Sequence, residues 1–221
     1  MSIEYSDNNP FYKLKDFLPP LDDSIQMLEK YVGDMAYHYE RGFYNLALFS
    51  FHYVYMTLLH IYLLKFHRMK VSIVNSCRQK RPPLEHLSPH AYCDVRDEKG
   101  RVHLFAGLNK EIATQHAQLV ITRDSIAHAT GTSITIDVFD RHIDNAINVL
   151  SSIQKHSLDI FIQYPSDSFN ETVAAIKTEL NDAEKLTRIS DMIKDFYISR
   201  NDWQYLISVG FINFGEYDDF I

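Results

Sequence analysis

The chain has 221 residues, of which 46% are hydrophobic and 23% charged. These proportions exclude a disordered or collagen-like protein and support one or two globular domains with a core of ordinary size. Seven glycines are few for an all-β protein with many tight turns, so the composition favours helices.

The net charge of −7 is concentrated at one end of the chain. Residues 156–221 contain 12 acidic and 5 basic residues, whereas residues 1–155 are neutral. Within the neutral part, residues 65–110 contain ten basic and four acidic residues. Such a local positive excess suits a polyanion such as RNA, and it equally suits an ordinary solvated loop. The candidate RNA-binding residues there are Arg78, Lys80 and Arg81.

The beginning of the chain and its two cysteines bear on the compartment. Residues 1–20 have no charged segment followed by an apolar one, so the sequence predicts a cytoplasmic protein without a signal peptide. Pro10 and the pair at 19–20 predict an N-terminal arm rather than a regular element. In a reducing compartment we do not expect a disulfide between Cys77 and Cys93.

Two helices are predicted next, over residues 21–42 and 43–64. The second segment contains no formal charge over a length that could cross a bilayer. Asn45, His52, His60 and several tyrosines recur along it, which favours a buried helix of a soluble bundle over a membrane span. We therefore expect no membrane partner.

An irregular insertion follows, since prolines and a glycine interrupt residues 82–100. Side chains of the types that bind zinc occur in or near it, but they lack the paired spacing of zinc sites. These residues are His86, His90, Cys93 and His103. The sequence therefore predicts neither a metal nor another cofactor.

The remaining elements alternate between helical spacing and linkers. Helical spacing returns over residues 108–128, with a break allowed, and an amphipathic helix follows up to His156. Beyond His156 we expect a short extended piece and a linker, two acidic helices at 171–180 and 183–197, and an aromatic tail. That tail could pack on the body of the protein or on a partner.

The stretch TRDSIAHATG, residues 122–131, combines groups that can act on a phosphate. Asp124 and His128 are four residues apart, so one helix face carries both and the carboxylate can orient the imidazole. Arg123 lies about 140° from His128 around an unbroken helix. The two converge only if Arg123 is at a helix start or kink, or if two copies of the motif face each other. Alternatively, the three residues form a structural helix pair and an arginine bonded to a neighbouring helix.

Arginine, a polar residue and a histidine in this order resemble the motif of the HEPN superfamily. The resemblance implies an all-α, HEPN-like helical bundle and a metal-independent RNA endonuclease, with Arg123, His128 and Asp124 as catalytic residues. It further implies a homodimer in which two motif helices build one cleft, and products with a 2′,3′-cyclic phosphate. Such a protein would act as a toxin or antiviral defence effector, with a possible inhibitory partner protein.

These patterns predict an arm at 1–20, a HEPN-like bundle with a loop insertion at 21–155, and an acidic C-terminal helical extension at 156–221. The alternative is a non-catalytic helical interaction module that binds a partner through its acidic helices and aromatic tail. The Arg123–His128 motif favours the enzyme.

Overall fold

The computed structural model describes residues 10–19, 23–68, 108–128, 133–178 and 181–215, and within these ranges every regular element is a helix. The predicted all-α class is therefore confirmed. The elements are η1 (Pro10–Phe17), α1 (Asp23–Glu40), α2 (Tyr44–Arg68), α6 (Lys110–Ala127), α7 (Ile136–Gln163), α8 (Asp167–Thr178), α9 (Asp182–Asp195) and α10 (Arg200–Ser208).

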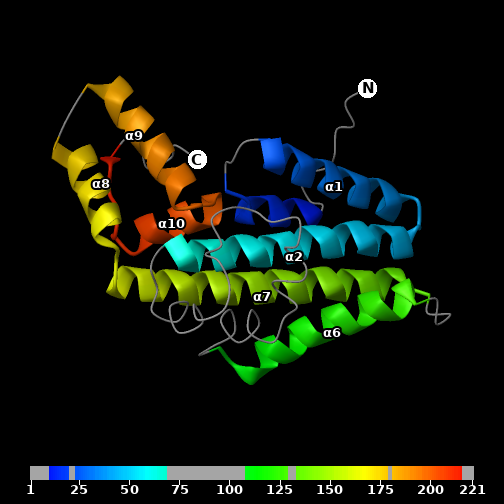
Figure 1. Ribbon diagram of the computed structural model, residues 1–221. Coiled ribbons are helices and arrows are strands. Elements are labelled where there is room, and N and C mark those ends of the chain that lie inside the picture. The colour runs from blue at the N-terminus through cyan, green and yellow to red at the C-terminus, as the bar shows by residue number, and fades with distance from the viewer. Residues whose placement is uncertain (1–9, 20–22, 69–107, 129–132, 179–180, 216–221) are drawn as a thin grey trace, which may run out of the picture.

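Two long helices, α2 and α7, run side by side through the centre of the molecule (Figure 1). The α1 helix packs along α2, and α6 packs against both α7 and α2. The α1–α2 turn, the end of α6 and the start of α7 meet at one end of this bundle, whereas α8, α9 and α10 gather at the other. The motif-bearing end of α6 is therefore remote from the acidic C-terminal helices.

The turn between α1 and α2 is fixed by Gly42. Its φ of +74° lies in the left-handed region that glycine adopts at low cost. The Gly42 N–H donates to the Tyr39 carbonyl and the Phe43 N–H donates to the His38 carbonyl, which is the Schellman pattern that ends a helix. The chain therefore reverses at once, and α2 returns along α1.

The uncharged segment at 43–64 forms the core of the bundle, as predicted. Most side chains of α2 are buried against α1, α6 and α7, including those of Phe51, Tyr55 and Leu58. His52 and His60 are buried in the same core. Of the helices in the described ranges, none is both long enough and apolar enough to cross a bilayer.

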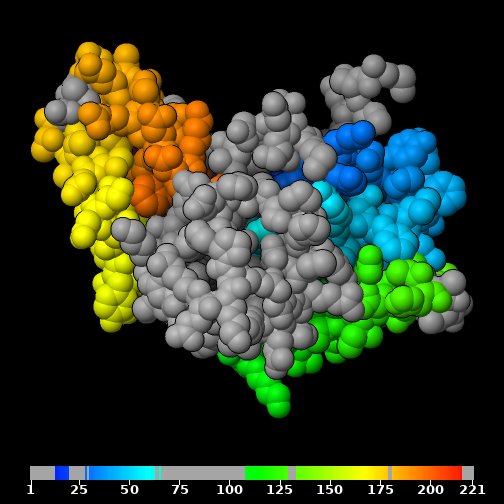
Figure 2. All heavy atoms as spheres, viewed as in Figure 1, coloured from blue at the N-terminus to red at the C-terminus, as the bar shows by residue number. Residues whose placement is uncertain are grey.

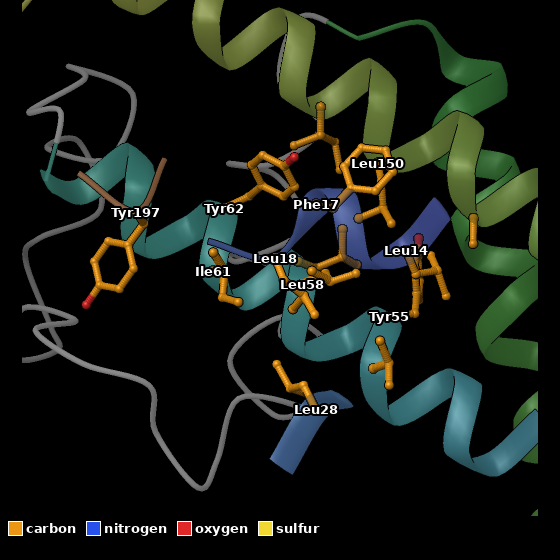
Figure 3. Close-up of a cluster of buried hydrophobic side chains, with 14 of the residues drawn as sticks. Leu14, Phe17, Leu18, Leu28, Tyr55, Leu58, Ile61, Tyr62, Leu150 and Tyr197 are labelled. Atoms are coloured by element: carbon orange, nitrogen blue, oxygen red, sulfur yellow. The ribbon is translucent and has the colours of Figure 1, made fainter. Parts of the chain in front are cut away.

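Part of the predicted N-terminal arm is a helix that belongs to the core. Residues 10–17 form η1, a 3-10 helix, and its Leu14 and Phe17 are fully or almost fully buried. Figure 3 shows these side chains, which come from η1, in one cluster with Leu58 and Tyr62 of α2. The flanking prolines limit the length of this helix, but they do not prevent three apolar side chains from packing.

The C-terminal third differs from the prediction in two elements, the segment after His156 and the tail, in which residues Arg200–Ser208 form the helix α10. The extended piece expected after His156 is wrong, because α7 continues to Gln163 and buries Leu158 and Phe161 on the same face as its earlier turns. The two acidic helices are present as α8 and α9. The aromatic tail packs on the body, since Trp203 is buried and its ring lies 5.8 Å from that of Phe214.

Candidate functional site

The motif helix α6 has a capped start and a defined end. The Asn109 side chain accepts a hydrogen bond of 3.0 Å from the Glu111 N–H, and the Glu111 carboxylate lies in the first turn, where the helix dipole favours negative charge. The helix then runs without interruption to Ala127. His128 is the C-cap residue, and its N–H donates to the Asp124 carbonyl at 3.0 Å. The predicted helix is thus present without the break that the sequence allowed.

Arg123 and Asp124 form an ion pair near the surface. The Arg123 Nη1 donates to the Asp124 Oδ1 over 2.9 Å, and the two side chains are 29% and 22% exposed. The Arg123 guanidinium carbon also lies 5.9 Å from the centroid of the Phe49 ring in α2, within the range of a cation–π contact. The arginine thus contacts a neighbouring helix, as the structural alternative expects, and keeps part of its surface open to solvent.

His128 lies at the exposed end of the same helix. Because Arg123 is inside an unbroken helix, neither a helix start nor an interruption turns it toward His128. The five-residue spacing then separates the directions of the two side chains by about 140°. Of the arrangements that could bring both groups to one phosphate, pairing with a second copy is the one still open.

A second contact holds α6 on α2, on the same face of α6 and about two turns before Arg123. The Tyr55 hydroxyl and the His116 Nδ1 are 2.9 Å apart in a buried hydrogen bond. Burial raises the pKa of the Tyr55 hydroxyl well above its ordinary value, so this phenol stays protonated. His116 and Arg123 are seven residues apart and share a helix face, and each meets an aromatic ring of α2. The register of the motif helix on α2 is therefore fixed at two points.

The chain that follows the motif is held on α1 and α2. The Asn45 side-chain oxygen accepts a hydrogen bond of 3.0 Å from the Ile134 N–H. The Tyr39 hydroxyl donates to the Asp140 Oδ1 at 2.8 Å, and burial together with this carboxylate raises the Tyr39 pKa. In the sequence, Asn45 is only a polar residue within an apolar helix. Nothing local in the sequence indicates that it bonds a backbone group 89 residues away.

Exposed apolar side chains gather in the half of the bundle that carries the motif. Among the described residues, nine large apolar side chains are exposed, and seven of them lie on α1, on or just before the first half of α2, on α6, or at the start of α7. These seven are Tyr37, Phe43, Leu46, Phe49, Tyr53, Ile121 and Ile136. The site therefore adjoins a surface more apolar than the rest of the described protein.

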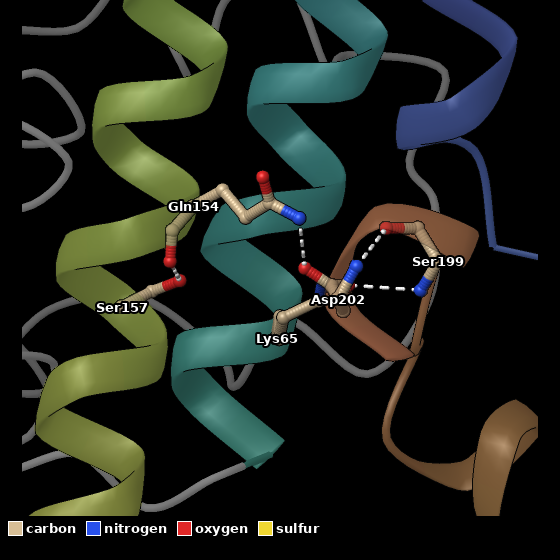
Figure 4. Close-up of polar contacts among 5 residues, drawn as sticks. All are labelled: Lys65, Gln154, Ser157, Ser199 and Asp202. Atoms are coloured by element: carbon tan, nitrogen blue, oxygen red, sulfur yellow. Dashed lines mark hydrogen bonds and ion pairs between the residues drawn. The ribbon is translucent and has the colours of Figure 1, made fainter. Parts of the chain in front are cut away.

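A separate polar network lies in the interior, where α2, α7 and α10 meet (Figure 4). The Lys65 ammonium pairs with the Asp202 carboxylate, and both side chains are almost completely buried. The other Asp202 oxygen accepts a 2.9 Å bond from the Gln154 amide. Asp202 also accepts from the Ser199 N–H at 2.8 Å, and the Ser199 hydroxyl accepts from the Asp202 N–H, which completes a capping box for α10.

This network has a structural role. Burial lowers the pKa of Lys65 although the neighbouring carboxylate acts in the opposite direction. The ammonium also lies 4.7 Å from the centroid of the Tyr62 ring, which fills the space beside it. With exposures of 1% and 0%, Lys65 and Asp202 cannot contact a substrate from solution. They tie the C-terminal helices to the central pair.

Several predicted residues lie outside the described ranges. Arg78, Lys80 and Arg81, the candidate RNA-binding residues, are among them, as are both cysteines, the histidines of the insertion, and Gly131. Within the part of the chain that is described, no group of three or more histidine, cysteine, aspartate or glutamate side chains is placed to hold a metal ion.

Comparison with known proteins identifies no relative of this chain. No family model matches the chain, and no curated protein or solved structure matches it either. The resemblance of residues 123–128 to the HEPN motif therefore remains an expectation from the sequence.

Proposed function

We propose that the protein is a metal-independent RNA endonuclease of HEPN type that acts as a homodimer. Arg123 and His128 are its catalytic residues, assisted by Asp124. The observation that carries the proposal is their position at the open end of α6, where His128 is exposed and Arg123 keeps 29% of its side chain exposed. A large substrate such as RNA could reach both groups there.

The proposed reaction needs one proton carrier and one fixed cation. The His128 imidazole takes the proton from a ribose 2′-hydroxyl, and the 2′ oxygen attacks the adjacent phosphorus. The bond from phosphorus to the 5′ oxygen breaks, and that oxygen takes a proton from water as it leaves, while the His128 imidazolium returns its proton to solvent. The products are a 2′,3′-cyclic phosphate and a 5′-hydroxyl. Since the two side chains of one copy diverge by about 140°, the guanidinium that stabilises the charge on the non-bridging oxygens is Arg123 of the second copy.

The ion pair with Asp124 is compatible with this role. A partly exposed pair contributes at most about 1 kcal/mol, because water screens it. A guanidinium binds phosphate oxygens through two parallel hydrogen bonds, so an RNA phosphate can compete with the carboxylate for Arg123. Asp124 then holds the arginine in a defined position until the substrate arrives.

The direct test is an analysis of RNA products. The purified full chain is incubated with single-stranded RNA in excess EDTA, and the ends of the fragments are identified. We expect cyclic phosphate and 5′-hydroxyl ends, and no cleavage of RNA whose 2′-hydroxyls are methylated. Cleavage that needs a divalent metal, or that proceeds on the methylated RNA, would contradict the proposal.

The second candidate is a non-catalytic interaction module, and the Arg123 contacts favour it. An arginine held by Asp124 and Phe49 is what a purely structural motif would show. The aromatic tail is less suited to binding a partner than the sequence suggested, since Trp203 is buried in the body. For this candidate, Arg123→Ala lowers the melting temperature and no nuclease activity exists to be lost. A role as a toxin or defence effector with an inhibitory partner belongs to the first candidate.

A further inference from the structure

The α2 helix is mostly buried, but one of its faces is exposed to solvent. Its positions 46, 49, 50, 53 and 57 follow helical spacing, and three of the five carry large apolar side chains. Together with the preceding Phe43, these side chains form what we call the α2 patch: Phe43 (55% exposed), Leu46 (51%), Phe49 (37%) and Tyr53 (41%).

The α2 patch lies between α1 and α6. On one side the Tyr53 ring is 4.3 Å from that of Tyr31 in α1, and on the other the Arg123 guanidinium lies over Phe49. Figure 2 shows the surfaces of the α1–α2 hairpin and of α6 adjoining at this end of the molecule. The patch is therefore continuous with the catalytic motif.

We infer that the α2 patch is the surface through which two copies of this chain associate, with the α2 helices facing each other across a twofold axis. The idea that the two copies complete a catalytic site rests on the proposed function. The contact surface itself is inferred only from the exposed apolar side chains and the charges around them. What the inference adds to the proposed homodimer is the face of each copy that the other copy covers.

The charges on this face suit an identical partner. A twofold interface brings each surface patch against itself, so a patch of one charge would repel its copy. The segment from Phe43 to Leu64 contains no charged residue, and the charges beside it come in both signs, Glu40 with Arg41 at one end and the Arg123–Asp124 pair at its side. Two copies can therefore meet without one patch of a single charge facing its own copy.

The size of the patch suits the apolar centre of a dimer interface. Each aromatic side chain has roughly 200 Å² of surface, so the exposed fractions leave on the order of 350 Å² of side chain uncovered per copy. That is close to half of the roughly 800 Å² that each partner buries in an interface of standard size. Leu46 at its centre is aliphatic, and α2 offers no cation to a phosphate before Lys65, so a second protein surface fits better than RNA bases.

The test measures the association state of the full chain. We expect wild type to be a dimer at micromolar concentration in sedimentation analysis, and Leu46→Glu to weaken the dimer by at least about tenfold. The matched control is Val209→Glu, which changes another exposed apolar residue (48% exposed) at the remote end and should leave the dimer unchanged. Helical circular dichroism should be the same for all three proteins, because Leu46 and Val209 are both half exposed.

Three outcomes would overturn the inference. These are a monomeric wild type at tens of micromolar, a Leu46→Glu protein that associates like wild type, and a monomeric wild type whose RNA binding is lost in Leu46→Glu. The last result would assign the patch to nucleic acid. RNA cleavage is assayed separately on the same samples: a dimer without cleavage refutes the proposed function alone, and an active dimer that Leu46→Glu does not weaken refutes the interface alone.

Discussion

The guanidinium of Arg123 lies 5.9 Å from the centroid of the Phe49 ring, so the motif-bearing end of α6 rests on the central helix of the bundle. The contact orients an arginine that would otherwise sample many conformations. The ion pair with Asp124 fixes the same side chain from within its own helix. A planar cation held at two points can present its remaining N–H groups to a phosphate in a defined direction.

Arg123→Lys tests whether this planar geometry matters. Lysine keeps the positive charge but loses the stacking surface and the paired donors, so we expect the RNA cleavage rate to fall by about tenfold or more. The free energy of unfolding should change by less than about 1 kcal/mol, because the Arg123 contacts are partly exposed. Arg141→Lys, at an exposed position on α7, is the control and should cleave like wild type. Equal rates for Arg123→Lys and wild type would argue against a guanidinium-specific role.

The buried pair of Lys65 and Asp202 should dominate the stability of the C-terminal helices. Asp202→Asn leaves the Lys65 charge without its counter-ion in the interior, and we expect a loss of about 3–5 kcal/mol in the free energy of unfolding. Lys65→Met should also destabilise, and the double variant should lose less than the sum of the two. Urea titration followed by the fluorescence of Trp203, the single tryptophan, measures all three. Additive effects would show that the two charges are not coupled.

The buried environment of His142 indicates that the protein loses stability on mild acidification. Its Nδ1 is 2.9 Å from the Val138 carbonyl and its Nε2 is buried with no hydrogen-bond partner in the described structure, so the neutral ring fits. Burial, opposed by the Val138 hydrogen bond and aided by Arg141, lowers the pKa of His142 below its ordinary 6.5. The unfolded chain therefore binds the proton more readily than the folded protein does. The contribution of neutral His142 to the free energy of unfolding is complete above pH 6.5, and it is lost as the pH falls through the pKa of His142 in the folded state.

Thermal unfolding between pH 7.5 and pH 5 checks this expectation. The melting temperature of wild type should fall over that range, and His142→Gln, which cannot become charged, should show a shallower fall. Parallel curves for the two proteins would mean that other groups carry the pH dependence.

The basic insertion allows a prediction from sequence alone. If residues 65–110 bind phosphates, replacing Arg78, Lys80 and Arg81 by glutamine should weaken RNA binding and flatten its dependence on salt concentration, because fewer counter-ions are released. Binding measured at several salt concentrations gives the slope. An unchanged slope would assign these side chains to ordinary surface.

Local patterns in the sequence were sufficient for the central helices. The uncharged segment predicted α2. The spacing of Ile143, Ile147 and Leu150 predicted α7, because residues buried on one face of a helix recur with the helical period. The same rule failed after His156. Clustered isoleucine and phenylalanine residues there indicate an extended piece, whereas the packing of Leu158 and Phe161 in the core carries α7 two turns further.

The contacts that define the site could not be predicted because they join distant segments. Phe49 and Arg123 come from different helices, and no periodicity relates them. Lys65 and Asp202 are 137 residues apart, and each looks like an ordinary surface charge in its own segment. The motif residues were found only because Arg123, Asp124 and His128 are close in sequence. Their positions on α6 follow from helix geometry, but the surface that they adjoin does not.

The rate of RNA cleavage by His128→Ala, in excess EDTA and under single-turnover conditions, tests the proposed function most directly. His128 is exposed at the end of α6, so its removal should leave the melting temperature unchanged. We expect the rate to fall by at least about a hundredfold, since loss of a general base typically costs that much, while His156→Ala, on α7 near the other end of the bundle, cleaves like wild type. Cleavage by His128→Ala at the wild-type rate would contradict the proposed function.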